Sequence, residues 1–234
     1  MIVKVCGMRK AVNIREISDL GVDWLGLIFW SESPRNVQQV ASRGGFIPDY
    51  TPIKGERPEL GVNKWLAPRE NNPKRVGVFV DDMPQTIVTR VFNFNLDFVQ
   101  LHGEELPVMI ENLRRTLEPD IRQGVKIIKT IPVETEADFA RCEDYKDVVD
   151  YFLFHNKCKE KGGSGEKFDW NILQAYKCDV PFVLSGGIGP DDAPLIKAIQ
   201  HPQLKAVDIN SRFETEVGVK DVALVKKFME ELKG

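Results

Sequence analysis

The chain has 234 residues, of which 42% are hydrophobic and 29% are charged, and its formal net charge at pH 7 is −3. This composition is typical of a globular protein with a substantial core, and the small net charge gives no sign of a nucleic-acid or membrane partner. No apolar run approaches the roughly 20 residues that span a bilayer. The apolar run that begins at Ile2 is too short for a signal peptide. We therefore expect a cytoplasmic protein of one large domain or two small ones.

Four cysteines are present, and none of them belongs to a C-x-x-C pair. They are Cys6, Cys142, Cys158 and Cys178. This spacing does not indicate a zinc site, and a reducing cytosol disfavours disulfides. We expect free thiols and no metal.

The first part of the chain contains two apolar runs, Ile2–Cys6 and Trp24–Phe29, which are predicted to be buried strands. Between them, Asn13–Leu20 carries apolar residues at helical spacing. A short helix is expected at Val37–Ser42. The next segment, Gly44–Pro73, has several prolines and glycines and little periodicity, which predicts an irregular insertion after the second strand. A domain linker is the alternative, but two strands would make a very small first domain.

From Arg75 onward, apolar runs alternate with segments of helical spacing. The predicted strands are Arg75–Val80, Asp97–Leu101, Val125–Thr130, one that begins at Tyr151, Pro181–Leu184 and Lys205–Ile209. The predicted helices are Pro84–Phe92, Glu104–Leu117, Glu134–Tyr145, Asp169–Tyr176, Pro190–Ile199 and Val219–Leu232. Strict alternation favours parallel strands with right-handed crossovers, so the α/β chain is predicted to form a single-domain (β/α)8 TIM barrel over residues 1–234. An open doubly wound sheet is the alternative, although no G-x-G-x-x-G follows the first strand.

In such a barrel the chemistry lies where the strands end. The polar residues at the predicted strand ends are Cys6, Arg35, Asp81, Asp82, Gln100, His102, His155, Asn156, Lys157, Ser185, Asp208, Asn210 and Ser211. Cys6 is either a small buried hydrophobe or, with a cation nearby, a base. Arg35 is either a solvated loop arginine or a fork for a carboxylate. His102 is either a structural histidine with its hydrogen bonds satisfied or a residue of the site.

Three glycine-rich or polar loops follow the last three predicted strands. They are Gly162–Gly165 (GGSG), Ser185–Gly187 (SGG) and Asn210–Ser211 (NS). Glycines let backbone N–H groups approach an anion closely, and helix N-termini add a favourable dipole. Each loop alone is compatible with a plain turn, but three in adjacent positions predict a phosphate site.

A set of motifs in order along nearly the whole chain resembles the phosphoribosylanthranilate isomerase family of the tryptophan pathway. The motifs are VCG (5–7), SPR (33–35), VGVFV (76–80), VQLHG (99–103), GGSG-x-x-FDW (162–170), LSGGI (184–188) and DINS-x-x-E (208–214). The resemblance implies the Amadori rearrangement of N-(5-phosphoribosyl)anthranilate to 1-(2-carboxyphenylamino)-1-deoxyribulose 5-phosphate, without metal or cofactor. A general acid opens the sugar ring, and a cysteine base removes the C2 proton. We expect this small molecule as the partner, and a monomer or a homodimer.

The resemblance also implies roles for individual residues. Cys6 is the expected general base, and Arg35 is expected near the anthranilate carboxylate. The substrate pocket is expected to include Gln100, His102 and Asp208. The phosphate site is expected to include Gly165, Gly186, Gly187, Asn210 and Ser211.

The chain departs from the family where the general acid is expected. Members carry a pattern like LFDTK, whereas this chain has Leu153-Phe154-His155-Asn156-Lys157, so His155 occupies the acid position. Its ordinary pKa of about 6.5 suits proton donation by an imidazolium, which Asp208 would favour and Lys157 would oppose. Alternatively, Asp208 donates the proton, or the chain is a catalytically impaired or non-catalytic phosphosugar-binding relative. A different phosphosugar isomerase or epimerase on the same fold is a further alternative. Arg212 also departs from the glycine of many members, either as a cation near the phosphate or as a solvent-facing residue.

Overall fold

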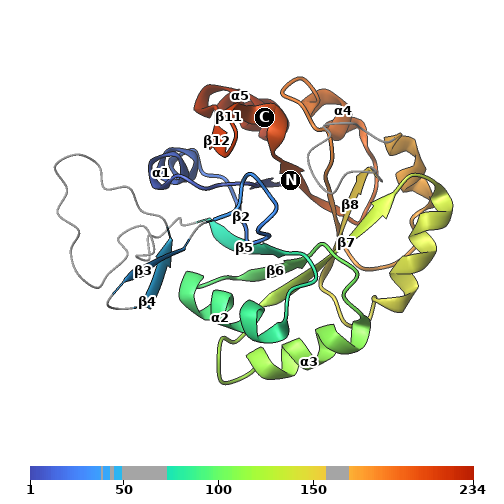
Figure 1. Cartoon of the computed structure of the whole chain (residues 1–234). Helices are drawn as coiled ribbons and strands as arrows, with labels where there is room; N and C mark the ends of the chain where they lie inside the picture. Colours follow the sequence, from blue (N-terminus) through green and yellow to red (C-terminus); the bar gives the residue numbers. More distant parts are fainter. Residues whose placement is uncertain (38, 43–44, 49–72, 157–168) are drawn as a thin grey trace.

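The computed structural model describes residues 1–37, 39–42, 45–48, 73–156 and 169–234. Eight parallel strands close into a barrel in the order β1-β10-β9-β8-β7-β6-β5-β2 (Figure 1). They are β1 (Ile2–Val5), β2 (Trp24–Ile28), β5 (Lys74–Phe79), β6 (Phe98–Leu101), β7 (Lys126–Val133), β8 (Tyr151–Asn156), β9 (Phe182–Leu184) and β10 (Leu204–Ile209). The barrel is closed because β1 pairs in parallel with both β2 and β10. The predicted (β/α)8 barrel is confirmed.

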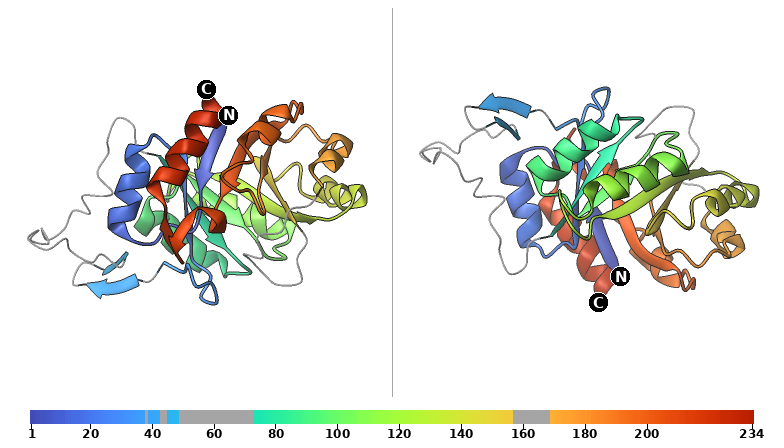
Figure 2. Two further views of the ribbon diagram at one scale, coloured as in Figure 1. Left: turned by 90° about the horizontal axis from the view of Figure 1, so that it is seen from above. Right: turned by 90° about the horizontal axis from the view of Figure 1, so that it is seen from below.

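The helices and helical turns connect the strands around the outside of the barrel. The α-helices are α1 (Ala11–Asp19), α2 (Pro84–Phe94), α3 (Pro107–Leu117), α4 (Ala193–Ala198) and α5 (Val222–Lys233). Both α2 and α3 begin with a proline, at a position whose N–H has no intrahelical partner anyway. The two chain termini lie side by side in both views of Figure 2. No helix within the described ranges is long and apolar enough to cross a membrane.

The interior of the barrel is filled by one side chain from each of seven strands. The cluster consists of Trp24, Val76, Phe98, Ile128, Leu153, Val183 and Ala206. Successive side chains of a strand point to opposite faces, so every second residue can point inward. The rings of Trp24 and Phe98 lie 4.4 Å apart between centroids. This packed layer closes the barrel below its carboxyl ends.

The helix predicted at Val37–Ser42 is wrong. Residues Gln39–Ser42 form strand β3, which pairs antiparallel with β4 (Gly45–Pro48). Six residues are too few for a self-sustaining helix, and β-branched residues such as Val40 and Ile47 favour extended backbone. Most of the irregular insertion predicted at 44–73 lies outside the described residues, so a single domain over 1–234 stays a prediction.

Other predicted elements exist but differ in type or length. The segments Glu136–Asp144 and Trp170–Ala175 are 3-10 rather than α-helical. A short ribbon of β11 (Glu214–Glu216) and β12 (Val219–Lys220) precedes the last helix. Helix α5 therefore begins at Val222 instead of Val219.

We expect Asp221→Ala to lower the free energy of unfolding by about 1 kcal/mol, because Asp221 is the N-cap of α5. Its Oδ1 accepts hydrogen bonds from the backbone N–H groups of Ala223 (2.9 Å) and Leu224 (3.0 Å). Urea unfolding measures the change. Lys226→Ala, on the exposed face of the same helix, is the control, and equal stability of the two variants would contradict the capping role.

Candidate active site

The alternation of inward and outward side chains along each strand also positions the residues of the candidate site. Most residues two positions beyond the apolar layer are polar or small, because they face inward one step nearer the carboxyl ends of the strands. These residues are Lys4, Gly26, Val78, Gln100, Thr130, His155, Ser185 and Asp208. The barrel mouth is the position where chemistry is found in this fold.

Cys6 lies beside a buried ion pair. Lys4 and Asp208 are register partners in β1 and β10, and their charged atoms are 2.9 Å apart, with side chains 0% and 7% exposed. The hydroxyl of Ser185 donates to Oδ2 of Asp208 over 3.3 Å. The other oxygen, Oδ1, is buried and has no hydrogen-bond partner within the described part of the chain. The site thus contains an unused acceptor close to the thiol.

The pKa values of this cluster are set mainly by burial. Burial raises the pKa of the Cys6 thiol, and Lys4 and Lys220 pull it down while Asp208 pushes it up. Burial also raises the pKa of Asp208, against the opposing effect of Lys4. Burial works to lower the pKa of Lys4, but the charges of Asp208 and Cys6 outweigh it, and that pKa is raised. The lysines therefore favour a thiolate that burial alone would disfavour.

Gly26 makes room for Cys6. A Cβ at this position would lie 2.6 Å from Sγ and 2.9 Å from Cα of Cys6, which no side chain tolerates. The sequence analysis did not single out this residue. A lone glycine inside the otherwise apolar run of β2 is the signal that would have found it, because such a glycine marks a close approach.

Arg35 is held by Glu214 in a bidentate ion pair. Its Nε donates to Oε1 over 2.8 Å and its Nη2 donates to Oε2 over 2.7 Å. Nζ of Lys220 donates to the same Oε1 of Glu214 over 2.6 Å and to Oδ1 of Asn210 over 2.7 Å. The hydrogen bonding of the Arg35 guanidinium to the Glu214 carboxylate is the main reason why the pKa of Arg35 is raised. Burial would raise the pKa of Glu214, but its two cationic partners hold it below its usual value.

The sequence analysis missed the roles of Glu214 and Lys220. Glu214 was visible as the last residue of the DINS-x-x-E motif, whereas Lys220 carried no signal.

Two histidines stack at the end of β6 and β8. The rings of His102 and His155 have centroids 4.9 Å apart and an interplanar angle of 20°. Nε2 of Gln100 lies 3.4 Å from Nδ1 of His102 and also 3.4 Å from Oγ1 of Thr130. The structure therefore brings Gln100, His102 and His155 together as expected from their strands.

The surroundings of His155 disfavour a charged imidazole near neutrality in the free protein. Burial lowers the pKa of His155 from 6.5 to about 4, and a hydrogen bond with the backbone of Asn156 offsets only part of this. Asp208 is not among the groups that raise it. Lys157, which was expected to oppose the charge, lies outside the described residues.

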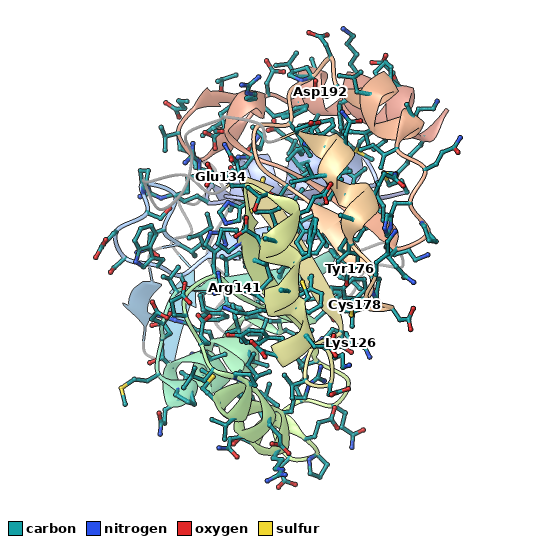
Figure 3. The ribbon with its side chains drawn as sticks, turned by 90° about the vertical axis from the view of Figure 1, so that its right-hand side faces the viewer. Lys126, Glu134, Arg141, Tyr176, Cys178 and Asp192 are labelled. Atoms are coloured by element: carbon teal, nitrogen blue, oxygen red, sulfur yellow. The ribbon has the colours of Figure 1, made fainter. Side chains whose placement is uncertain are left out.

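The loop after β9 lies beside the end of β8. Gly186 and Gly187 both have positive φ, and a Cβ at Gly186 would lie 3.0 Å from the backbone nitrogen of Asn156. The adjacent N–H of Gly189 is held by Asp192, labelled in Figure 3, over 2.6 Å. Gly165 and the rest of the GGSG loop lie outside the described residues.

The residues after β10 border the same loops. Asn210 and Ser211 directly follow the strand. Arg212 is exposed, and its side chain runs past Gly189, where an added Cβ would lie 3.5 Å from Cδ of Arg212. Two of the three predicted anion-binding loops are thus neighbours on one sector of the mouth.

The described residues contain no group of three or more His, Cys, Asp or Glu side chains that could hold a metal ion. The fold and the polar mouth define a (β/α)8-barrel protein whose candidate site lies at the carboxyl ends of the strands.

Comparison with known proteins narrows this class. The family model of N-(5'phosphoribosyl)anthranilate (PRA) isomerase matches residues 61–231. The N-(5'-phosphoribosyl)anthranilate isomerase of Parabacteroides distasonis is 37% identical over 232 residues, covering 99% of this chain and 93% of the relative. That of Phocaeicola vulgatus is also 37% identical, with 100% and 98% covered. The crystal structure of the Thermotoga maritima enzyme is 28% identical, covers all of both chains and has a TM-score of 0.71. The chain belongs to the PRA isomerase family, and the resemblance of its motifs is confirmed.

We expect the imidazole of His155 to titrate near pH 4 instead of 6.5, because burial penalises its charged form. The unfolded chain then binds more protons between these two values, so this group reduces stability progressively as the pH falls from 6.5 toward 4. NMR titration of the ring signals measures the pKa, with His155→Gln to assign the resonance. A value above 6 in the free protein would contradict the expectation.

Proposed function

We propose that the chain catalyses the isomerisation of N-(5'-phosphoribosyl)anthranilate to 1-(2-carboxyphenylamino)-1-deoxyribulose 5-phosphate. Family membership supports the reaction. The observation that carries it is the position of Cys6 at the barrel mouth, beside the Lys4–Asp208 ion pair and within electrostatic reach of Lys220. The reaction needs a base near the sugar carbons and anchors for two anionic ends.

Cys6 is the proposed base that removes the C2 proton after ring opening. A thiolate is the competent form, and burial works against it. Lys4 and Lys220 both favour the thiolate by their positive charge. When the Cys6 thiolate takes up the proton from C2, its negative charge beside Lys4 is neutralised.

His155 is the proposed acid that protonates the ring oxygen. It is neutral in the free protein, because its pKa is about 4. The substrate brings a carboxylate and a phosphate, and nearby anions raise the pKa of an imidazole. Substrate binding and protonation of His155 are therefore proposed to be coupled.

Asp208 is a second candidate for the acid. Its pKa is raised by burial, and its Oδ1 has no partner among the described residues. A carboxyl group kept protonated in this way can donate a proton. The ion pair of its other oxygen with Lys4 stabilises the carboxylate instead. We therefore assign Asp208 to the substrate pocket and keep His155 in the acid position.

The two ends of the substrate have separate proposed anchors. Arg35 uses two of its five N–H donors on Glu214, and further donors of its fork suit the anthranilate carboxylate. Gln100 and His102 are proposed to line the pocket between the anchors. The phosphate is proposed to bind three segments: Gly165 in the loop after β8, the backbone of Gly186 and Gly187 after β9, and Asn210 and Ser211 after β10.

We propose that the enzyme acts in the cytoplasm on this small molecule alone, as a monomer or a homodimer and without a metal or an organic cofactor. The small net charge of −3 supports the absence of a nucleic-acid partner. The three described cysteines are free thiols, in keeping with a reducing compartment.

Turnover of N-(5'-phosphoribosyl)anthranilate by the purified protein tests the function directly. Growth without tryptophan of a strain that lacks the isomerase tests it in cells. Binding of the substrate without turnover would favour the non-catalytic phosphosugar-binding alternative.

We expect Cys6→Ser to reduce kcat by about 10²-fold or more and to leave KM within a few-fold, because a serine hydroxyl loses its proton far less readily than a thiol and so supplies almost none of the anionic base. Steady-state kinetics separate the two constants. Cys142→Ser, which removes another buried thiol, is the control and should keep its turnover. Full turnover by the Cys6 variant would exclude this residue as the base.

We expect His155→Ala to reduce kcat by about 10²- to 10⁴-fold, the usual contribution of a general acid. His155→Asp restores the acid of the family pattern and should retain turnover. Kinetics of both variants between pH 5 and 9 measure this. If the alanine variant is as fast as the parent, His155 is not the acid, and loss of turnover in Asp208→Asn would then assign the proton to Asp208.

A further inference from the structure

Lys220 lies on β12, outside the barrel, yet it reaches the mouth. Its side chain is completely buried. Its ammonium group donates to Oδ1 of Asn210 over 2.7 Å and to Oε1 of Glu214 over 2.6 Å. A buried lysine is costly unless each of its donors finds a partner. The identity of these two partners is therefore informative.

The backbone of Lys220 is fixed from the opposite side. The side chain of Asn13, in α1, accepts a hydrogen bond from the N–H of Lys220 over 2.7 Å and donates to its C=O over 2.9 Å. Lys220 also pairs with Glu214 in the β11–β12 ribbon. Asn13 of α1 and the β11 strand of the ribbon thereby hold the backbone of this residue from two sides, and its ammonium group has a defined position.

One branch from Lys220 leads to Arg35. Glu214 receives Lys220 on Oε1 and both Nε and Nη2 of Arg35 on its two oxygens. Oε1 of Glu214 also accepts a longer hydrogen bond from the backbone N–H of Gly218 (3.2 Å), and the shorter bond from the ammonium group of Lys220 contributes the charged contact that fixes the plane of the carboxylate. The orientation of the guanidinium follows from that plane, because a bidentate pair is planar.

The other branch leads to Asn210. An ammonium group has donors only, so it must face the amide oxygen of Asn210, as it does. The amide nitrogen is then directed to the opposite side of the group. An asparagine whose oxygen is fixed by Lys220 offers its Nδ2 as a donor for an anion.

We propose that Lys220 is a positioning residue that holds the carboxylate-binding Arg35 and the phosphate-binding Asn210 in one arrangement. The two anchors are then held at a fixed separation that matches the distance between the two anionic ends of the substrate. Binding at both anchors places the sugar carbons against Cys6. This inference rests on the proposed function for the assignment of the two anchors.

Lys129 provides a matched comparison. It is equally buried and pairs with Glu105 over 2.9 Å. However, its other bond goes to the carbonyl of Gly103, and Glu105 accepts from the backbone N–H groups of Asp81 and Gly103. Its partners belong to the loop after β6 and include neither proposed anchor. Lys129 therefore serves as the structural control.

The test compares Lys220→Met with Lys129→Met. Both variants lose a buried ammonium group, and both are expected to melt at lower temperature than the parent. Calorimetric titration with two probes, anthranilate and inorganic phosphate, then reports on each anchor. We expect Lys220→Met to weaken both probes by about tenfold, the effect of losing one orienting hydrogen bond at each anchor, and Lys129→Met to weaken neither.

Variants of the anchors complete the pattern. Glu214→Gln should weaken anthranilate more than phosphate, and Asn210→Ala should weaken phosphate alone. If Lys220→Met does not fold, Lys220→Arg replaces it: the charge is retained, but the planar fork cannot reproduce both bonds, so both probes should still weaken.

Several results would overturn the inference. They are equal probe affinities in the two methionine variants, a loss of one probe only in Lys220→Met or Lys220→Arg, and failure of the parent to bind either probe. Probe binding is measured without turnover. Absence of isomerase activity with the expected binding pattern would therefore refute the proposed reaction and leave the positioning role supported.

Discussion

The structure depends on one geometric constraint, the two-residue alternation of side chains in a closed parallel barrel. Seven apolar side chains form the inner layer, and the next inward positions carry most of the polar groups of the mouth. Trp24 and Gly26 illustrate this relation within a single strand, since one fills the barrel and the other leaves room for Cys6. The residues that pack the barrel and the residues that form the candidate site therefore occupy different positions of the same strands.

The charges at the mouth favour an anionic ligand. Lys4, Arg35 and Lys220 contribute three positive charges, and Asp208 and Glu214 contribute two negative charges, which leaves a formal excess of +1 while Cys6 is a neutral thiol. Each acid is used to hold a cation in place: Asp208 binds Lys4, and Glu214 binds both Arg35 and Lys220. Burying these groups carries a desolvation cost. An anionic ligand would offset this cost, because its negative charges would pair with the cations of the mouth.

The sequence was sufficient for the fold because the alternation of strands and helices is regular from Arg75 to the last helix, and parallel order then leaves few topologies. It also located Cys6 and His155, since strand ends are visible as apolar runs that stop. The helix predicted at Val37–Ser42 was wrong because the local spacing of apolar residues does not reveal that this segment pairs with another strand.

The hydrogen-bond network of Lys220 could not be predicted from the sequence, for a different reason. Lys220 and Asn13 are 207 positions apart in the chain, and only the closed barrel brings them together. The pKa of His155 was misjudged on similar grounds, because it depends on how the neighbouring elements bury the ring. Burial at a strand end is a tertiary property that residue type alone does not report.

The exchange of an acidic residue for His155 has a consequence for the whole mouth. An aspartate at this position would add a negative charge to a pocket that is proposed to bind two anionic groups, unless it were protonated. A histidine with a pKa near 4 is neutral in the free protein and leaves the positive excess intact. Binding of the anions then supplies the field that draws a proton onto the imidazole. In the proposed mechanism, the proton needed for ring opening arrives with the substrate and is not carried by the free protein. The substrate ends that are proposed to bind Arg35 and Asn210 then help to create the acid that acts at the centre of the substrate.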